Sequence, residues 1–185
     1  MGPDYCVRPP QTPIYVFCLD VSPNAVEAGL TEATLQALKE GVREGVLPGG
    51  EKARVGLVTF ASKVQFYRIG AGWREGGKDG EDEPPSVYVL GDVDDPFAAL
   101  PPDQWIVADK IKFLALLDHI PALSFGATAA AAAAAVAAAG GNGGGGVEYA
   151  QMREREEAAS VAAVEAVGDA LATLGGRVFM FTASR

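Results

Sequence analysis

The sequence predicts an α/β fold in which a layered sheet carries helices on both of its faces. Short apolar runs typical of strands lie at 14–19, 54–60 and 177–181. Patterns with helical spacing separate these runs, and glycine or proline clusters close most of the elements. Strands that alternate with helices in this way are typical of a sheet with parallel strands and a helix layer on each side.

The first predicted strand, 14–19, is an unbroken apolar run, which suits a strand buried on both faces of a parallel sheet. Asp20 follows at its carboxyl end. Apolar residues then recur at helical spacing until Pro48-Gly49-Gly50, which predicts one helix of about six turns. The residues of this pattern are Val26, Leu30, Leu38, Val42 and Val46.

Two further strands are predicted at 54–60 and 64–69. The link between them is too short for a parallel return, which needs a crossover of about a dozen residues, so the pair is antiparallel. The stretch 70–85 is glycine-rich and charged and predicts an exposed loop. A brief strand at 87–90 and an acidic loop at 91–102 follow.

Two more helices and a last strand complete the pattern. The first of these helices carries Val107, Ile111, Leu114 and Leu117 on one face and stops at Pro121. The stretch 126–150 is a low-complexity Ala/Gly insertion. The next helix begins near Met152, and a buried strand at 177–181 follows it. Its predicted apolar stripe is Val161, Val164, Val167, Leu171 and Leu174.

Composition narrows the possible functions. The chain has 185 residues, a length typical of one domain, and a net charge of -9. The negative charge argues against nucleic-acid binding through phosphate contacts. The longest alanine-rich run is too short and too weakly apolar to span a bilayer, and no signal peptide is visible at Met1.

The cysteines indicate a reducing, cytosolic setting without a disulfide framework. Only Cys6 and Cys18 occur, and Cys18 lies inside the first predicted strand. Two cysteines and one histidine cannot form a typical structural zinc site, so the chain itself is expected to hold no metal or cofactor.

Asp20, Ser22 and Asn24 form the main candidate site, because ligands of open α/β sheets bind at the carboxyl ends of strands. Asp-x-Ser-x-Asn has the spacing of the metal-binding loop of von Willebrand A-type domains, and oxygen ligands suit magnesium. Asn stands at the third position, however, and Thr-Ala-Ser follows the last strand where an Asp is needed. The alternatives are therefore a strand-to-helix joint with a helix cap and a metal-dependent binding module that uses Asp20 and Ser22. An Asp-nucleophile phosphatase is a third reading, but Ser22 stands where its second Asp belongs.

Several motifs, in this order along the chain, resemble one known family, the trunk domain of the cargo-selecting subunit of the COPII vesicle coat (Sec23/Sec24-type). They are DYCVRPPQ from Asp4, YVFCLDVSPNAVEAG, LPG from Leu47, RVGLVTFAS, VQFYRI, GDVDDPFAALP and GGRVFMF. The resemblance implies a von Willebrand A-like (Rossmann-like) layered sheet without a working metal site, so that Asp20, Ser22 and Asn24 are vestigial metal-loop positions.

The resemblance also implies the domain organisation. Residues 13–185 correspond to a partial trunk, a fragment incomplete at the C-terminus, and 1–12 to a linker from an upstream zinc finger that carries the family's structural zinc. Phe179 and its neighbours are then expected at an unprotected sheet edge.

The function that the resemblance implies is a non-enzymatic cargo adaptor in endoplasmic reticulum to Golgi transport. Its implied partners are the coat's GTPase-activating subunit, a small GTPase, and cargo and SNARE sorting signals. Its implied location is the cytoplasm, on COPII-coated vesicles and the cytosolic face of the endoplasmic reticulum membrane, as a peripheral protein. Tyr5 matches a cargo-pocket position of the family, and Arg8 lies close to it in the sequence.

Overall fold

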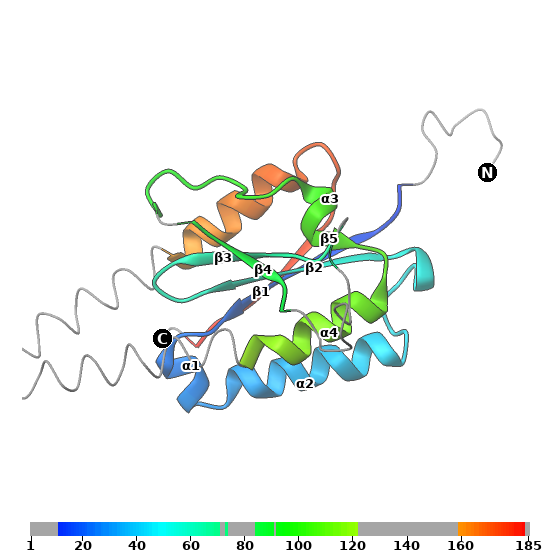
Figure 1. The fold of residues 1–185 in the computed structure, drawn as a ribbon, viewed down its shortest axis with the longest axis horizontal. Coiled ribbons are helices and arrows are strands. Elements are labelled where there is room, and N and C mark those ends of the chain that lie inside the picture. Colours follow the sequence, from blue (N-terminus) through cyan, green and yellow to red (C-terminus); the bar gives the residue numbers. More distant parts are fainter. Residues whose placement is uncertain (1–10, 71–72, 74–83, 91, 122–158, 184–185) are drawn as a thin grey trace, which may run out of the picture.

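A six-stranded sheet runs through the middle of the molecule (Figure 1). The computed structural model describes residues 11–70, 73, 84–90, 92–121 and 159–183. Five strands follow one another in the order β4-β3-β2-β1-β6, and β5 pairs with β2. The strands are β1 Ile14–Asp20, β2 Arg54–Phe60, β3 Val64–Arg68, β4 Ser86–Leu90, β5 Ile106–Val107 and β6 Arg177–Phe181.

The strand directions agree with the prediction of parallel strands and one antiparallel pair. β1 lies between β2 and β6 and is parallel to both. The predicted antiparallel pair is confirmed in β2 and β3, and β4 continues this antiparallel part of the sheet. All five predicted strands are present, and β5 is the only further strand in the described part of the chain, so the apolar runs located the sheet well.

The prediction of one long helix after Asp20 is wrong. Two helices occupy this stretch, α1 (Pro23–Glu27) and α2 (Leu30–Arg43). Gly29 separates them with a φ of 75°, a left-handed conformation that glycine adopts without the strain of a Cβ atom. Val46 follows the end of α2 and is 63% exposed.

The next helix also begins later than predicted. A short helix, α3 (Pro102–Trp105), leads into β5, so Val107 lies in a strand. The carboxylate of Asp109 then accepts hydrogen bonds from the backbone N–H groups of the two residues after Lys110, and α4 runs over Lys110–Ile120. Ile111 is exposed as a result, and the buried side of α4 is formed by Phe113, Leu116, Leu117 and Ile120.

The last helix covers 159–171 within the described residues and contacts the sheet through alanines. Val161 and Val164 of the predicted stripe point away from the core and are exposed, whereas Val167 and Leu171 are buried as predicted. Because an alanine side chain ends at Cβ, this helix can pack close to the strands, and the larger valines are left outside. The buried alanines are Ala159, Ala162, Ala163 and Ala166.

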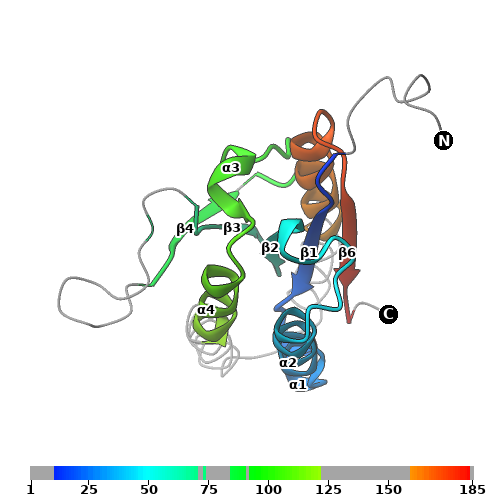
Figure 2. The same cartoon turned by 90° about the vertical axis from the view of Figure 1, so that its right-hand side faces the viewer.

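The helices form one layer on each face of the sheet, as the sequence predicts (Figures 1 and 2). α2 and α4 cover one face, and their core includes Phe17 of β1 and Phe113. The helix 159–171 covers the other face, and the core beneath it includes Val16 and Cys18 of β1 and Trp105. Both faces of β1 are therefore buried.

β6 is not the buried strand that the sequence suggests. It lies at an end of the sheet and pairs with β1 alone among the described strands (Figure 2). Val178, Phe179 and Met180 are 38%, 40% and 36% exposed. The expectation of a sheet edge at Phe179 is thus confirmed for the described part of the chain.

Parts of the predicted organisation lie outside the described residues. Of the predicted linker 1–12 only Gln11 and Thr12 are described, and the insertion 126–150 falls wholly outside. Among the described helices, none has the length and apolar character needed to cross a membrane.

Candidate functional site

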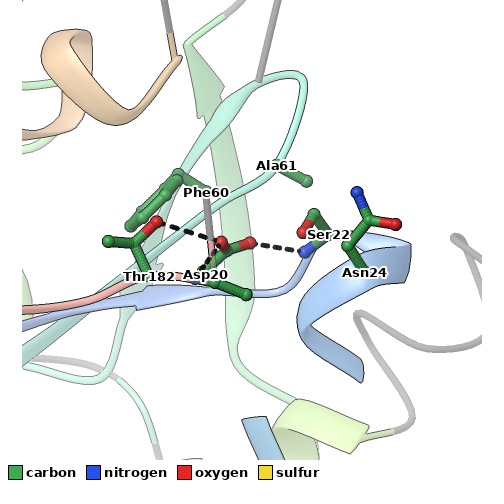
Figure 3. A pocket seen from close by; sticks show the side chains of 7 residues that line it. Asp20, Ser22, Asn24, Phe60, Ala61 and Thr182 are labelled. Carbon is green, nitrogen blue, oxygen red and sulfur yellow. Dashed lines mark hydrogen bonds between the residues drawn. The ribbon is translucent and has the colours of Figure 1, made fainter. Parts of the chain in front are cut away.

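The candidate site lies where three parallel strands end side by side. Asp20 is the last residue of β1, Phe60 the last of β2, and Thr182 follows β6 (Figure 3). The backbone N–H of Val21 donates to the carbonyl of Phe60 at 2.9 Å, which holds the turn after β1 against β2. The side chain of Asp20 is buried at the centre of this junction.

Both carboxylate oxygens of Asp20 accept hydrogen bonds from the protein. Oδ1 accepts from the backbone N–H of Ser22 at 2.8 Å. Oδ2 accepts from the backbone N–H of Ala183 at 3.0 Å and from the hydroxyl of Thr182 at 3.3 Å. We call this set of three hydrogen bonds the Asp20 clamp. It connects the end of β1 with the chain that leaves β6.

Ser22 begins helix α1, as its position in the sequence predicts. Its Oγ accepts a hydrogen bond from the backbone N–H of Ala25 at 3.3 Å, and Pro23 occupies the first helical turn. The carbonyl of Asp20 accepts a further bond from the hydroxyl of Thr31 in α2, at 3.0 Å. The joint between strand and helix is therefore satisfied by local hydrogen bonds.

Asn24 lies at the rim of the site and is exposed. Together with Asp20, Ser22, Ala61 and Thr182 it lines a hollow of about 20 Å³ (Figure 3). A single water needs about 10–15 Å³ measured in this way, so the hollow is of water size.

The donors around Asp20 do not suit a metal centre. N–H and O–H groups point at both carboxylate oxygens, where a cation would require lone pairs from further oxygens. Within the described ranges, no three His, Cys, Asp or Glu side chains are grouped closely enough to hold a metal ion. Asp20 and Ser22 are thus held by hydrogen bonds and helix capping, and Asn24 lies beside them at the rim of the hollow.

Cys18 lies in β1, two residues before Asp20, and is a free thiol. Burial raises its pKa to about 12, because the thiolate loses its hydration inside the sheet. A thiol in this state is a poor nucleophile at neutral pH.

Tyr5 and Arg8, the two remaining predicted site residues, lie outside the described residues.

A second hollow, of about 490 Å³, lies beside α2 and Pro121, and no motif in the sequence pointed to it. An ion pair between Lys39 of α2 and Asp118 of α4, at 2.6 Å, joins the same two helices.

Fold and site together define a protein of the layered α/β class whose sheet-end junction is built from protein hydrogen bonds. The family model described as "Sec23/Sec24 trunk domain" matches residues 10–140. The chain therefore belongs to the Sec23/Sec24 trunk family, as its motifs predicted.

Curated proteins similar to this chain include Sec24 transport proteins. Human "Protein transport protein Sec24B" is 39% identical over 98 residues, which are 53% of this chain and 7% of that protein. Mouse "Protein transport protein Sec24A" is 31% identical over 122 residues, 65% of this chain and 10% of that protein. The Arabidopsis thaliana protein SEC24 A is also 31% identical over 122 residues. The chain thus spans about a tenth of the length of these relatives.

One solved structure supports the fold. The crystal structure of the human COPII-coat protein Sec24c matches with a TM-score of 0.59 and 23% sequence identity. The match covers 96% of this chain and 20% of that protein. The α/β fold predicted from the sequence is therefore confirmed by a protein of the same family.

Proposed function

We propose that this chain is a trunk segment of a COPII coat cargo adaptor that acts in endoplasmic reticulum to Golgi transport through protein contacts. The observation that carries this proposal is the family match together with relatives that are named Sec24 transport proteins. The sheet-end residues support it, because hydrogen bonds within the fold already occupy the carboxylate of Asp20. An adaptor of this kind needs neither a catalytic residue nor a cofactor of its own.

The proposed partners are those of a coat subunit: the GTPase-activating subunit of the inner coat, the coat's small GTPase, and cargo and SNARE sorting signals. The proposed location is the cytosolic face of the endoplasmic reticulum membrane and the vesicles that leave it, with peripheral attachment. The net charge of -9 favours basic protein surfaces over nucleic acid as partners.

The direct test is co-purification with the GTPase-activating coat subunit. Tagged chain of residues 1–185 is mixed with the purified partner subunit at about 0.1 M salt, at which charges more than about 10 Å apart are already screened. We expect the partner to be retained by the chain and not by the tag alone. Absence of retention in this assay would contradict the proposed function.

Tyr5 and Arg8 are proposed as cargo contacts, and a second assay examines them. The variants Tyr5→Ala and Arg8→Ala are expected to reduce binding of cargo sorting-signal peptides and to leave retention of the partner subunit unchanged. Gln11→Ala, a neighbouring exposed residue, is the matched control. Peptide binding that is equal in all three variants would remove both residues from the proposal.

Magnesium titration separates this function from that of a metal-dependent binding module. A ligand that binds only the folded state must raise the thermal midpoint. For the adaptor we expect the same midpoint with and without millimolar magnesium. A rise that disappears in Asp20→Asn would favour the metal-dependent module.

A further inference from the structure

Arg68, the last residue of β3, carries a positive charge that no side chain in the described part of the chain neutralises. Its side chain is partly buried, and its Nε–H group is buried without a hydrogen-bond acceptor among the described residues. No carboxylate of the described residues lies within ion-pair distance of its guanidinium. A buried N–H group without an acceptor lowers stability, so this position gains from an anion that accepts its hydrogen bonds.

The surroundings of Arg68 favour a strong interaction with such an anion. Arg68 lies two residues after Phe66, so the two side chains leave β3 on the same face of the sheet. The ring of Phe66 packs edge-on against the buried ring of Trp105, with centroids 5.2 Å apart and an interplanar angle of 82°. Charge-assisted hydrogen bonds are stronger beside an apolar cluster of this kind than in open water.

Ser86 is the residue that can carry the anion. It is the first residue of β4 and lies directly opposite Arg68 in the antiparallel β3–β4 pair. Directly opposite residues share one face of the sheet, with Cβ atoms about 4.5–5.5 Å apart. Ser86 is exposed, so its hydroxyl is open to an enzyme from outside. Apart from Arg68, β3 and β4 contain no charged residue that would compete for this contact.

From these observations we propose that Ser86 is a phosphorylation site and that Arg68 binds its phosphate across the β3–β4 pair. The phosphate has three acceptor oxygens and a charge of about -1.5 to -2 at neutral pH. The planar guanidinium can donate two parallel N–H bonds to such a group. The inference does not depend on the proposed coat function.

The group is transferred from ATP by a protein kinase. Oγ of Ser86 forms a bond to the terminal phosphorus of ATP, and the bond from that phosphorus to the bridging oxygen breaks. ADP leaves with the electron pair of the broken bond, and the hydroxyl proton passes to a base of the kinase. Phosphorylation then adds a link between β3 and β4 at Arg68 and Ser86, the last pair of their ladder.

The first test examines the protein isolated from its own cells while phosphatases are inhibited. Trypsin cleaves after Lys78 and Lys110, and the peptide 79–110 contains Ser86 as its only serine and no threonine. Fragmentation in a mass spectrometer separates Ser86 from Tyr88, the other hydroxyl of this peptide. We expect a phosphorylated form with the group on Ser86. Recovery of the peptide in unmodified form alone, or with the phosphate on Tyr88, would overturn the proposal.

The second test uses the chain 1–185 synthesised with phosphoserine at position 86. We expect its thermal midpoint to lie about 2–4 °C above that of the unmodified chain, and this rise to be lost in Arg68→Gln. Arg177→Gln is the matched control and is expected to keep the rise, because Arg177 is an exposed arginine on β6, at the other end of the sheet. An equal rise in Arg68→Gln, or no rise in the native chain, would contradict binding by Arg68.

A local measurement makes the test independent of the stability of each variant. A neighbouring guanidinium favours the doubly charged phosphate, so we expect a phosphorus-31 NMR titration to give a lower pKa for the phosphate in the native chain than in Arg68→Gln. Arg68→Lys is expected to keep part of this decrease, because lysine retains the charge without the paired donors. The same phosphate pKa in all three chains, shown by circular dichroism to be folded, would refute the contact with Arg68.

Discussion

β1 and β6 place the same residue types side by side in very different surroundings. Val16 pairs in register with Val178, and Phe17 with Phe179. Val16 and Phe17 are 0% and 4% exposed, whereas their partners on β6 are 38% and 40% exposed. Among the described strands, the two differ in their neighbours, since β1 lies between two strands and β6 lies beside one. Burial in this sheet therefore depends on strand order more than on the apolar character of the strand.

The largest difference is expected between Phe17→Ala and Phe179→Ala. Removing a fully buried ring costs about 3–5 kcal/mol of unfolding free energy. A ring that is 40% exposed already has part of its surface in water, so we expect about half of that cost for Phe179. Urea denaturation of both variants measures the two values. Equal losses would mean that β6 is covered in solution.

The Asp20 clamp is the polar link between these two strands, and its loss is the next largest effect. Asp20→Asn keeps the shape of the side chain but turns an NH₂ group toward one of the N–H or O–H donors. We expect a loss of about 2–3 kcal/mol, the value for hydrogen bonds to a charged group that is buried. Thermal and urea unfolding measure it.

Asp92→Asn is the matched control for the clamp. Asp92 accepts one hydrogen bond from the backbone N–H of Asp94, at 3.1 Å, in an exposed loop. We expect a change below about 0.5 kcal/mol there. Similar losses in the two variants would argue against a structural role specific to Asp20.

Val16→Thr and Val178→Thr compare the strands without a change in size. A hydroxyl placed in the core beside Val16 lacks a partner and costs about 1–3 kcal/mol. At Val178 water can reach the hydroxyl, and we expect less than about 0.5 kcal/mol. A large loss of unfolding free energy in Val178→Thr would show that water does not reach this side of β6.

The smallest effect concerns Cys18 and appears only at alkaline pH. Its pKa is raised from 9.0 to about 12, so the folded chain keeps the thiol protonated where the unfolded chain ionises. The stabilisation is complete well below pH 9 and falls as the pH rises toward 12, with a loss of about 1.4 kcal/mol by pH 10. The difference in unfolding free energy between the native chain and Cys18→Ala, followed from pH 8 to 10, isolates this contribution from lysine and tyrosine. A constant difference would contradict it.

The sequence predicted the strands well because β-forming apolar runs are a local property. It failed where the outcome depended on packing. Gly29 divides the predicted long helix because the chain turns there, and glycine alone makes that turn without strain. The alanine face of the helix 159–171 was missed for a related reason: the valines carry the stronger apolar signal, but the smaller side chains fit the sheet.

The candidate site shows the same division. The residues Asp20, Ser22 and Asn24 were identified from their spacing, and the capping role of Ser22 follows from local chemistry. The hydrogen-bond partners of the Asp20 carboxylate could not be predicted from local chemistry, because Thr182 and Ala183 lie 162 and 163 positions away in the chain. Only the register of β6 against β1 brings them to Asp20.

This separation in the chain has a consequence for synthesis on the ribosome. The strand that completes the pairing of β1 is made after nearly the whole segment has emerged. At about 5–20 residues per second, the 163 positions between Asp20 and Ala183 take roughly ten to thirty seconds to translate. During that time β1 has β2 on one side and an open edge on the other. The nascent chain is therefore most vulnerable to wrong pairing at the strand that becomes its most deeply buried one.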